Sequence, residues 1–277
     1  NENLNAFLEV FEDTARAQAA VVDQKIKDGK AGRLAGMVIG LKDNLCYKGH
    51  KVSASSKILM DFESLYTGTA VQRLLDEDAI IIGRLNCDEF AMGSSNENSA
   101  FGSVKNAIDP SKVPGGSSGG SAVAVQAGTC LVSLGTDTGG SVRQPAAFCG
   151  VIGMKPTYGR ISRFGLLAYA SSFDQIGILA NSVEDVSILL GIMSGYDEND
   201  STSSEKPVED FSKNLISEGK KKIAYFKNAL EHESIDEEIR QQTFALIEKL
   251  KADGHEVMPV EFEYLDYIIP AYYVLTT

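Results

Sequence analysis

Two serines in glycine-rich segments are the residues of this sequence most suited to chemistry. Ser117 lies in VPGGSSGGS, and Ser141 lies further along in TDTGGSVR. Glycine lets backbone amides approach a bound group closely. A serine hydroxyl among free N–H groups is what acyl transfer requires, because the hydroxyl attacks a carbonyl and the amides stabilise the oxyanion that forms. These segments therefore predict a serine nucleophile.

Ser141 is the stronger candidate nucleophile, although many serines in such a position only cap a helix. The run CLVSLGTD predicts a strand and the residues after Ser141 predict a helix. The hydroxyl would then lie on a sharp turn at the carboxyl edge of a sheet, where α/β proteins bind ligands. Four amides could converge there on an oxyanion. They belong to Thr138, Gly139, Gly140 and Ser141.

A nucleophilic serine needs a base, and a lysine fits better than a histidine. The three histidines are widely scattered, so a Ser–His–Asp triad is possible but unsupported. Lys42 ends the apolar run MVIGLKDN, and a lysine that emerges from a buried strand loses its proton more readily. A solvated surface charge is the alternative role. Ser117 could pass the Ser141 proton to Lys42, because a hydroxyl accepts and donates at once.

Two charged residues flank the expected nucleophile turn. Asp137 could accept hydrogen bonds that brace the turn, which would be a structural role. Arg143 could meet a carboxylate or cap the turn, and both roles stay open. The segment around Ser117 lacks the GxxxxGK[ST] pattern of a phosphate-binding loop, and its apolar flanks argue against a flexible linker.

The elements that must position these residues alternate between strands and helices. Buried strands are predicted at MVIGLKDN, AIIIGRL and CLVSLGTD, and helices over residues 4–27, 118–127, 141–148 and 182–193. This alternation predicts an α/β fold with helices on both sheet faces. The acidic, serine-rich segment 195–207 predicts a linker. A strand, an amphipathic helix over 235–252 and another strand follow it.

Composition narrows the functional class. Asp and Glu number 38 against 26 Lys and Arg, and the net charge of −12 counts against direct binding of nucleic acid or an anionic membrane. The four cysteines form no CxxC pair and the histidines no cluster, so we expect reduced thiols, no metal site and a cytoplasmic protein. Because the chain lacks an initiator Met and ends in an apolar aromatic run, we expect a piece of a longer protein.

At Lys42, Ser117 and Ser141 the chain resembles the amidase signature family, whose hallmark is a Ser–cisSer–Lys triad. Its serines lie in GGSSGG and DTGGS segments and its lysine in a preceding GxKD segment, and the resemblance spans most of 34–193, the expected catalytic core. The resemblance implies one domain of this family over 1–277, truncated at both ends. It also implies a mixed sheet covered by helices on both faces, and a cis peptide between Gly116 and Ser117.

Two further segments resemble the glutaminase subunits of the tRNA-dependent amidotransferases within that family. They are DEFAMGSSNENSAFG and GMKPTYGRISRFGLLAYASSFDQIG. The resemblance implies that glutamine is hydrolysed to supply ammonia for converting Glu-tRNA(Gln) to Gln-tRNA(Gln), with Asp-tRNA(Asn) left open as another acceptor. A B subunit would bind the aminoacyl-tRNA and use ATP and Mg²⁺, and a C subunit would wrap around the A–B junction. The chain itself would bind no cofactor.

The same resemblance implies a glutamine pocket lined by Met92, Gly93 and Ser94, for which an ordinary loop is the alternative. Residues that hold the α-carboxylate and α-amine of glutamine would lie beyond Thr277, and either Tyr272 or Tyr273 would match a substrate-contacting tyrosine. Two other functions stay open: a stand-alone amidase acting on another amide, and an inactive truncated fragment.

Overall fold

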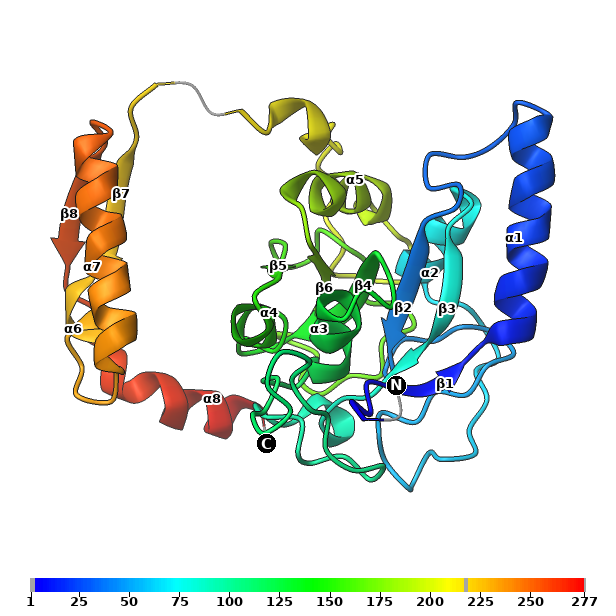
Figure 1. The fold of residues 1–277 in the computed structure, drawn as a ribbon, viewed down its shortest axis with the longest axis horizontal. Helices are drawn as coiled ribbons and strands as arrows, with labels where there is room; N and C mark the ends of the chain where they lie inside the picture. Colours follow the sequence, from blue (N-terminus) through cyan, green and yellow to red (C-terminus); the bar gives the residue numbers. More distant parts are fainter. Residues whose placement is uncertain (1–2, 217–218, 277) are drawn as a thin grey trace. The chain divides into compact units, whose positions relative to one another are not determined.

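A six-stranded mixed sheet is the framework of the first of two structural units (Figure 1). The computed structural model describes residues 3–216 and 219–276, and the units are Asn1–Leu215 and Ile216–Thr277. The strand order is β1–β3–β2–β4–β6–β5. Their bounds are β1 Phe7–Val10, β2 Val38–Lys42, β3 Ile80–Leu85, β4 Val132–Asp137, β5 Ile152–Met154 and β6 Gln175–Ala180.

The central strands of this sheet run parallel, and the outer ones do not. Strand β2 is parallel to both β3 and β4, so the carboxyl ends of β2 and β4 meet at the same edge. Strand β1 is antiparallel to β3, and β6 is antiparallel to both β4 and β5. The predicted mixed α/β sheet is confirmed.

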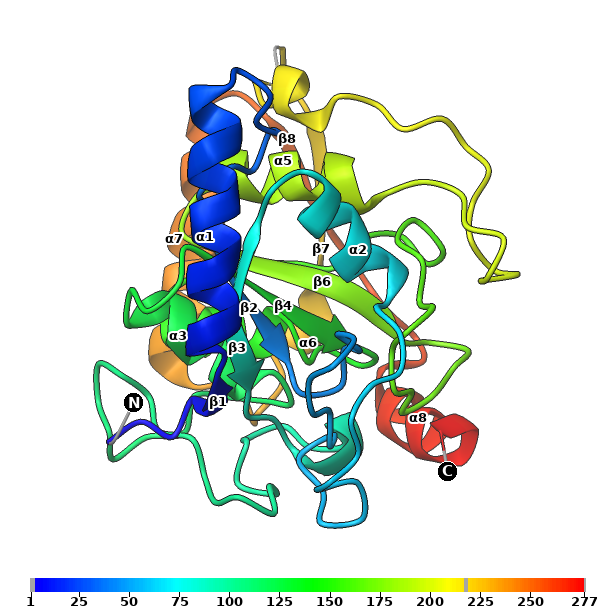
Figure 2. The same cartoon turned by 90° about the vertical axis from the view of Figure 1, so that its right-hand side faces the viewer.

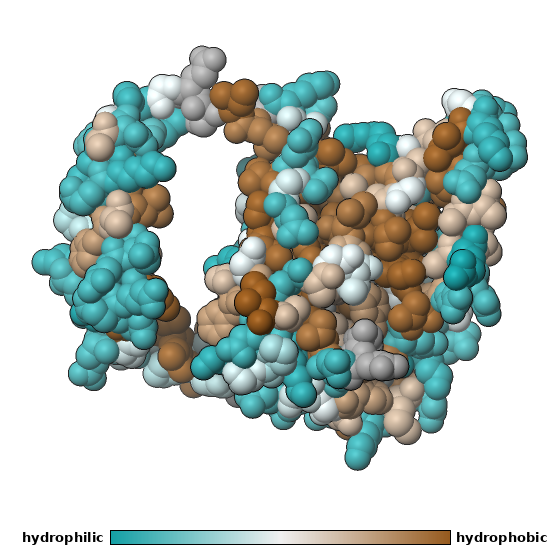
Figure 3. Space-filling model, in the orientation of Figure 1, coloured by the Kyte–Doolittle hydropathy of each residue, from teal (hydrophilic) through white to brown (hydrophobic). Residues whose placement is uncertain are grey.

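Helices cover both faces of the sheet, as predicted. One buried apolar cluster joins the sheet to α2 (Thr69–Asp76) and α5 (Val183–Met193), and another joins it to α3 (Gly119–Gln126) and α4 (Arg143–Cys149). Helix α1 (Glu12–Lys27) runs alongside β3 (Figure 2). The outward side of α1 is hydrophilic, and hydrophobic residues gather between α1 and the sheet (Figure 3).

The chain's first element differs from its prediction. A helix was expected over 4–27, but β1 occupies Phe7–Val10 and the helix begins at Glu12. The apolar spacing of this segment fits a short strand as well as a helix turn. Pairing with β3 decides the outcome, because Gly83 leaves room for β1: a Cβ on Gly83 would lie 2.3 Å from the Glu9 carbonyl oxygen.

The acidic segment 195–207 is not a linker. The Asp197 carboxylate accepts hydrogen bonds from the hydroxyls of Thr69 at 2.5 Å and Ser162 at 2.6 Å, and Asp200 accepts from the Arg163 amide at 2.8 Å. The segment is therefore fastened to the first unit, and the boundary between units follows Leu215. Composition predicted a solvated linker because it does not show that these carboxylates meet donors.

The second unit contains the predicted strand–helix–strand. Strand β7 (Lys222–Phe226) is parallel to β8 (Glu256–Val260), and α7 (Glu237–Ala252) connects them. Two further helices are α6 (Lys227–Leu230) and α8 (Ile268–Thr276), and α8 contains both Tyr272 and Tyr273. A 3₁₀ turn at Leu265–Tyr267 precedes α8, and two others, Glu89–Ala91 and Phe211–Asn214, lie in the first unit. Among the described residues, no helix has the length and apolar content needed to cross a bilayer.

Helix α3 is the element on which the site depends most, and its small residues let it pack against backbone. Gly119 to Val125 are all buried. A Cβ on Gly120 would lie 2.4 Å from the carbonyl oxygen of Asn86 and 2.7 Å from that of Ala6. Backbone oxygens cannot move aside as a flexible side chain can, so this position admits only glycine.

We expect Gly120→Ala to destabilise the protein by about 1–3 kcal/mol, because overpacking against backbone outweighs the gain in helix propensity. Gly191→Ala is the matched control: it also lies within a helix, and nothing stands within 4 Å of its Cβ position. The control should gain up to about 1 kcal/mol. Urea denaturation measures both, and equal effects of the two substitutions would contradict the packing argument.

Candidate active site

Lys42 is the fully buried last residue of β2. Side chains alternate along a strand. Ile39 and Leu41 face the cluster with α2 and α5, so Lys42 faces α3 on the other side. Its Nζ atom lies 2.7 Å from the Ser117 Oγ. Two more hydroxyls surround the amine, those of Ser118 at 3.0 Å and Thr136 at 2.9 Å. The predicted meeting of Lys42 with Ser117 is present.

Burial lowers the pKa of Lys42 from its usual 10.5, because an ammonium without water is unfavourable. Negative charges at Asp88, Asp137 and Asp174 oppose this shift without overcoming it. Cys87 adds no charge at neutral pH, because burial raises the pKa of its thiol to about 12. Burial therefore shifts Lys42 toward the neutral amine, the form that can accept a proton.

The segment carrying Ser117 is held by side chains on both sides. The Gly116–Ser117 peptide is cis, as the family resemblance implied. Gln144 accepts a hydrogen bond from the Gly116 amide at 2.9 Å and donates to the Ser94 carbonyl at 2.8 Å. On the other side, a Cβ on Gly116 would lie 2.2 Å from the Asp88 Oδ2. This packing fixes the backbone that presents the Ser117 hydroxyl.

Asp137 braces the nucleophile turn, as the sequence indicated. Its carboxylate accepts hydrogen bonds from the amides of Gly140 at 2.9 Å, Val142 at 3.1 Å and Arg143 at 3.3 Å. The Arg143 guanidinium makes two more bonds to it, so Arg143 both meets a carboxylate and secures the turn. Burial alone would raise the pKa of Asp137, but the bonds from Arg143 and Val142 outweigh burial and lower it.

The structure narrows the set of amides expected to bind an oxyanion. The Gly140 amide already donates to Asp137 Oδ1, so its place in the predicted set is corrected. In the part of the chain that the structure describes, the amides of Thr138, Gly139 and Ser141 donate to no protein acceptor. Sequence spacing could not show this, because it does not reveal which N–H the neighbouring carboxylate takes.

A backbone hydrogen bond joins Ser141 to the segment that carries Ser117. The Ser118 amide donates to the Ser141 carbonyl at 3.1 Å, which ties the start of α3 to the nucleophile turn. Ser141 is 9% exposed. His50 is engaged elsewhere: its ring stacks on Tyr47, and its Nε2 lies 3.1 Å from the Thr14 hydroxyl. His50 is thus bonded to other residues, and the catalytic roles of Lys42, Ser117 and Ser141 stay predictions.

Met92, Gly93 and Ser94 form an exposed loop next to the Ser117 segment. Gly93 packs against Asp88, since a Cβ there would lie 2.3 Å from the Asp88 Cγ, and Gln144 joins the Ser94 carbonyl to Gly116. The loop thus lies near the candidate site. Its role in binding glutamine stays a prediction.

Several residues of the site were not predicted from the sequence. The hydroxyls of Ser118 and Thr136 lie within hydrogen-bond distance of the Lys42 Nζ. The Asp88 amide donates to the Ser117 carbonyl at 3.2 Å, and Gln144 accepts from the Gly116 amide. Ser118 adjoins Ser117, and Thr136 precedes the nucleophile turn, so their proximity was a usable signal. No local pattern marks Asp88 or Gln144, because their contacts form only once distant segments fold together.

The described part of the chain holds no cluster of side chains suited to a metal ion. All four cysteines are buried and free. Burial raises the pKa of Cys87, Cys130 and Cys149 to about 12, which keeps these thiols unreactive.

A buried lysine, a neighbouring serine in a cis peptide and a serine on a glycine-rich turn are the arrangement that the resemblance to the amidase signature family implied. The chain belongs to the amidase family, which it matches over residues 1–277. It is 50% identical over 276 residues to the A subunit of the glutamyl-tRNA(Gln) amidotransferase of Chlorobium phaeobacteroides, covering 99% of this chain and 58% of that protein. The corresponding protein of Acidobacterium capsulatum is 48% identical over 278 residues, again with 58% of its length covered.

Solved structures show the same fold. The A subunit of the glutamyl-tRNA(Gln) amidotransferase of Thermotoga maritima aligns with a TM-score of 0.86 at 38% identity, covering 99% of this chain and 58% of that one. The native peptide amidase of Stenotrophomonas maltophilia aligns with a TM-score of 0.87 at 31% identity, covering 99% and 57%. The chain thus spans somewhat more than half the length of the relatives it matches.

Lys42→Met should change how stability depends on pH. The unfolded chain keeps the Lys42 proton up to about pH 10.5, whereas the folded protein releases it at lower pH because burial lowers the pKa. Between those values the unfolded state binds more protons, so the wild-type unfolding free energy should rise with pH relative to Lys42→Met, by at most about 1.4 kcal/mol per pH unit.

Urea denaturation between pH 7 and 10 measures this difference. Lys30→Met is the control, because Lys30 is exposed and the substitution should leave the pH dependence unchanged. A Lys42→Met difference that stays flat or falls with rising pH would show that the folded protein keeps this lysine charged.

Proposed function

We propose that this chain is the catalytic part of a glutaminase subunit in a tRNA-dependent amidotransferase. The observation that carries the proposal is the buried contact of 2.7 Å between the Lys42 Nζ and the Ser117 Oγ, beside the Ser141 turn. Identity near 50% with the A subunits of several glutamyl-tRNA(Gln) amidotransferases supports glutamine as the amide donor.

The proposed first half-reaction forms an acyl-enzyme. Neutral Lys42 takes the proton of the Ser117 hydroxyl, and Ser117 takes that of Ser141 as the Ser141 Oγ bonds to the side-chain carbonyl carbon of glutamine. The carbonyl electron pair moves to oxygen, where the amides of Thr138, Gly139 and Ser141 would stabilise it. The C–N bond then breaks, and the relay returns a proton to nitrogen, so that ammonia leaves.

The second half-reaction frees the enzyme. Water attacks the γ-glutamyl ester and gives its proton through Ser117 to Lys42. The ester C–O bond breaks, Ser141 regains a proton from the relay, and glutamate departs. A base buried from water suits both halves, because it must be neutral at the start of each and charged only in between.

The proposal assigns the other steps of the transferase to partner subunits. A B subunit would bind aminoacyl-tRNA and use ATP and Mg²⁺ to activate the glutamyl carboxylate. A C subunit would wrap around the junction between this chain and the B subunit. The net charge of −12 supports this division, since a strongly acidic chain is poorly suited to binding tRNA by itself. The proposed location is the cytoplasm, and the proposed product is Gln-tRNA(Gln).

A stand-alone amidase is the second candidate, and likeness to a peptide amidase at 31% identity favours it. The two candidates differ in substrate and in assembly. Glutamine-dependent ammonia release, together with co-purification of two partner subunits with the full-length protein, supports the transferase. Hydrolysis of other amides by the protein alone supports the stand-alone enzyme.

Ser141→Ala and Lys42→Ala in the full-length protein should each lower glutaminase kcat by more than about 1,000-fold, because each removes a member of one relay. Ammonia release from glutamine measures the effect. Ser201→Ala and Lys30→Ala are matched controls at exposed positions and should keep wild-type turnover. Near-normal turnover of either relay variant would end the proposed mechanism.

A further inference from the structure

Thr138 and Asp174 face each other where the β4–β6 ladder ends. The last registered pair of these antiparallel strands is Asp137 with Gln175. Thr138 follows Asp137 and Asp174 precedes Gln175, so the same register sets the two residues opposite each other. Beyond the ladder a side-chain bond takes over: the Thr138 hydroxyl donates to Asp174 Oδ1 at 2.6 Å.

This side-chain bond leaves the Thr138 backbone available. Had the ladder continued, the Thr138 amide could have served strand pairing. Within residues 3–216 and 219–276 it donates to no protein acceptor, although the residue is fixed through its side chain. The chain next passes through Gly139 and Gly140, and Gly140 has a φ of 135° that only glycine adopts readily. The Thr138 side chain thus fixes the chain directly before this glycine turn.

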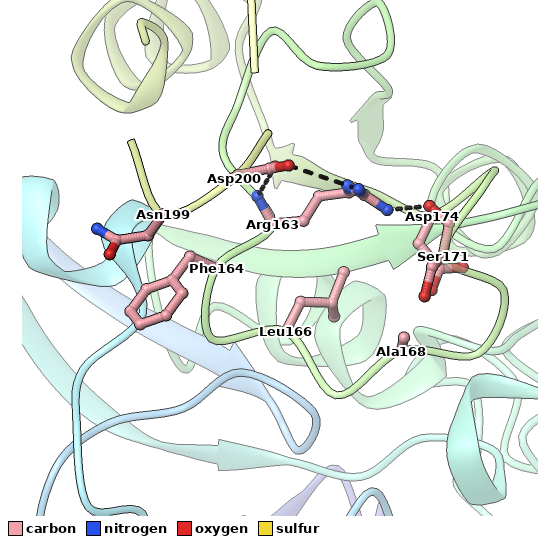
Figure 4. A pocket seen from close by; sticks show the side chains of 8 residues that line it. All are labelled: Arg163, Phe164, Leu166, Ala168, Ser171, Asp174, Asn199 and Asp200. Carbon is pink, nitrogen blue, oxygen red and sulfur yellow. Dashed lines mark hydrogen bonds and ion pairs between the residues drawn. The ribbon is translucent and has the colours of Figure 1, made fainter. Parts of the chain in front are cut away.

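Asp174 is held rigidly enough to anchor the Thr138 side chain. Its Oδ2 accepts from the amides of Tyr169 at 2.8 Å and Ala170 at 3.0 Å, and its own amide donates to the Ala170 carbonyl. Only 2% of the residue is exposed. Asp174 also lines a cavity of about 190 Å³, with Arg163 and Ser171 among its other residues (Figure 4).

We propose that Asp174 is a positioning residue for acyl transfer: by holding the Thr138 side chain, it keeps the Thr138 N–H aimed at the oxyanion. The inference rests on the proposed function, because it presumes that Ser141 attacks an amide. Oxyanion donors act by being fixed before charge develops, so a freed Thr138 should slow the chemical step and not substrate binding.

The test uses the full-length protein assembled with its partner subunits. Thr138→Val removes the hydroxyl while keeping the shape of the side chain, and Thr138→Ser keeps the hydroxyl as the matched control. We expect Thr138→Val to lower glutaminase kcat by roughly 10- to 100-fold and to leave KM for glutamine within about threefold of wild type. This loss of kcat is smaller than that for complete removal of an oxyanion donor, because the Thr138 N–H is still present. Thr138→Ser should stay within about threefold of wild type.

A double-mutant cycle with Asp174→Asn tests whether the pair acts as a unit. If it does, adding Thr138→Val to Asp174→Asn should lower kcat by less than twofold further. Fully additive losses would overturn the proposal, as would wild-type kcat in Thr138→Val or an equal loss in Thr138→Ser. Should Asp174→Asn not fold, the comparison of Val with Ser at position 138 decides alone.

Two controls separate this inference from failure of the proposed function. Thermal unfolding of Thr138→Val must match that of Thr138→Ser, because a loss confined to stability would mark a merely structural contact and overturn the proposal. Labelling of Ser141 by a fluorophosphonate reports the nucleophile itself. Absent labelling in the wild type would defeat the proposed function, whereas normal wild-type labelling that slows in Thr138→Val supports the positioning role.

Discussion

The burial of the Lys42 amine, away from solvent and without a contacting carboxylate, is the constraint on which the rest of the site depends. Lys42 is fully buried, and its Nζ contacts three hydroxyls. Among the described residues, no acidic side chain pairs directly with it. Burying an unpaired ammonium costs several kcal/mol, and removing the proton of an ordinary lysine at pH 7 costs about 5 kcal/mol. Burial therefore lowers the pKa of Lys42, which makes its amine a better proton acceptor than that of a solvated lysine.

The remaining architecture keeps that amine dry and brings hydroxyls to it. Parallel pairing puts the ends of β2 and β4 at one sheet edge, so Lys42 and Thr136 arrive together. Ser117 and Ser118 come from the start of α3, which approaches the sheet because Gly135 has no side chain: a Cβ there would lie 2.7 Å from the Ser118 Oγ. Glycine thus serves packing at this site as much as it serves turn conformation.

The parts of the site predictable from sequence were those encoded locally. Lys42 ends an apolar run, and Ser141 follows a strand and precedes a helix, so each could be placed on its element. The hydrogen bond from the Gly140 amide to Asp137 could not be predicted from sequence. A glycine-rich turn next to an aspartate can direct its amides either to that carboxylate or to a bound anion, and the sequence is the same in both cases. The first strand was predicted as a helix for a different reason. Its pairing with β3 is a contact between distant segments, which the local apolar spacing does not show.

The distribution of these contacts bears on what the first unit can do. Among the described residues, the side-chain hydrogen bonds that hold Lys42, the Gly116–Ser117 peptide and the Ser141 turn come from residues between 42 and 174, all within that unit. The residues proposed to form the proton relay are therefore held by contacts within one unit, whereas an amino acid's α-carboxylate and α-amine would need charged partners of their own. We therefore expect the Ser141 hydroxyl to react with a small acylating reagent even under conditions in which the protein does not bind glutamine.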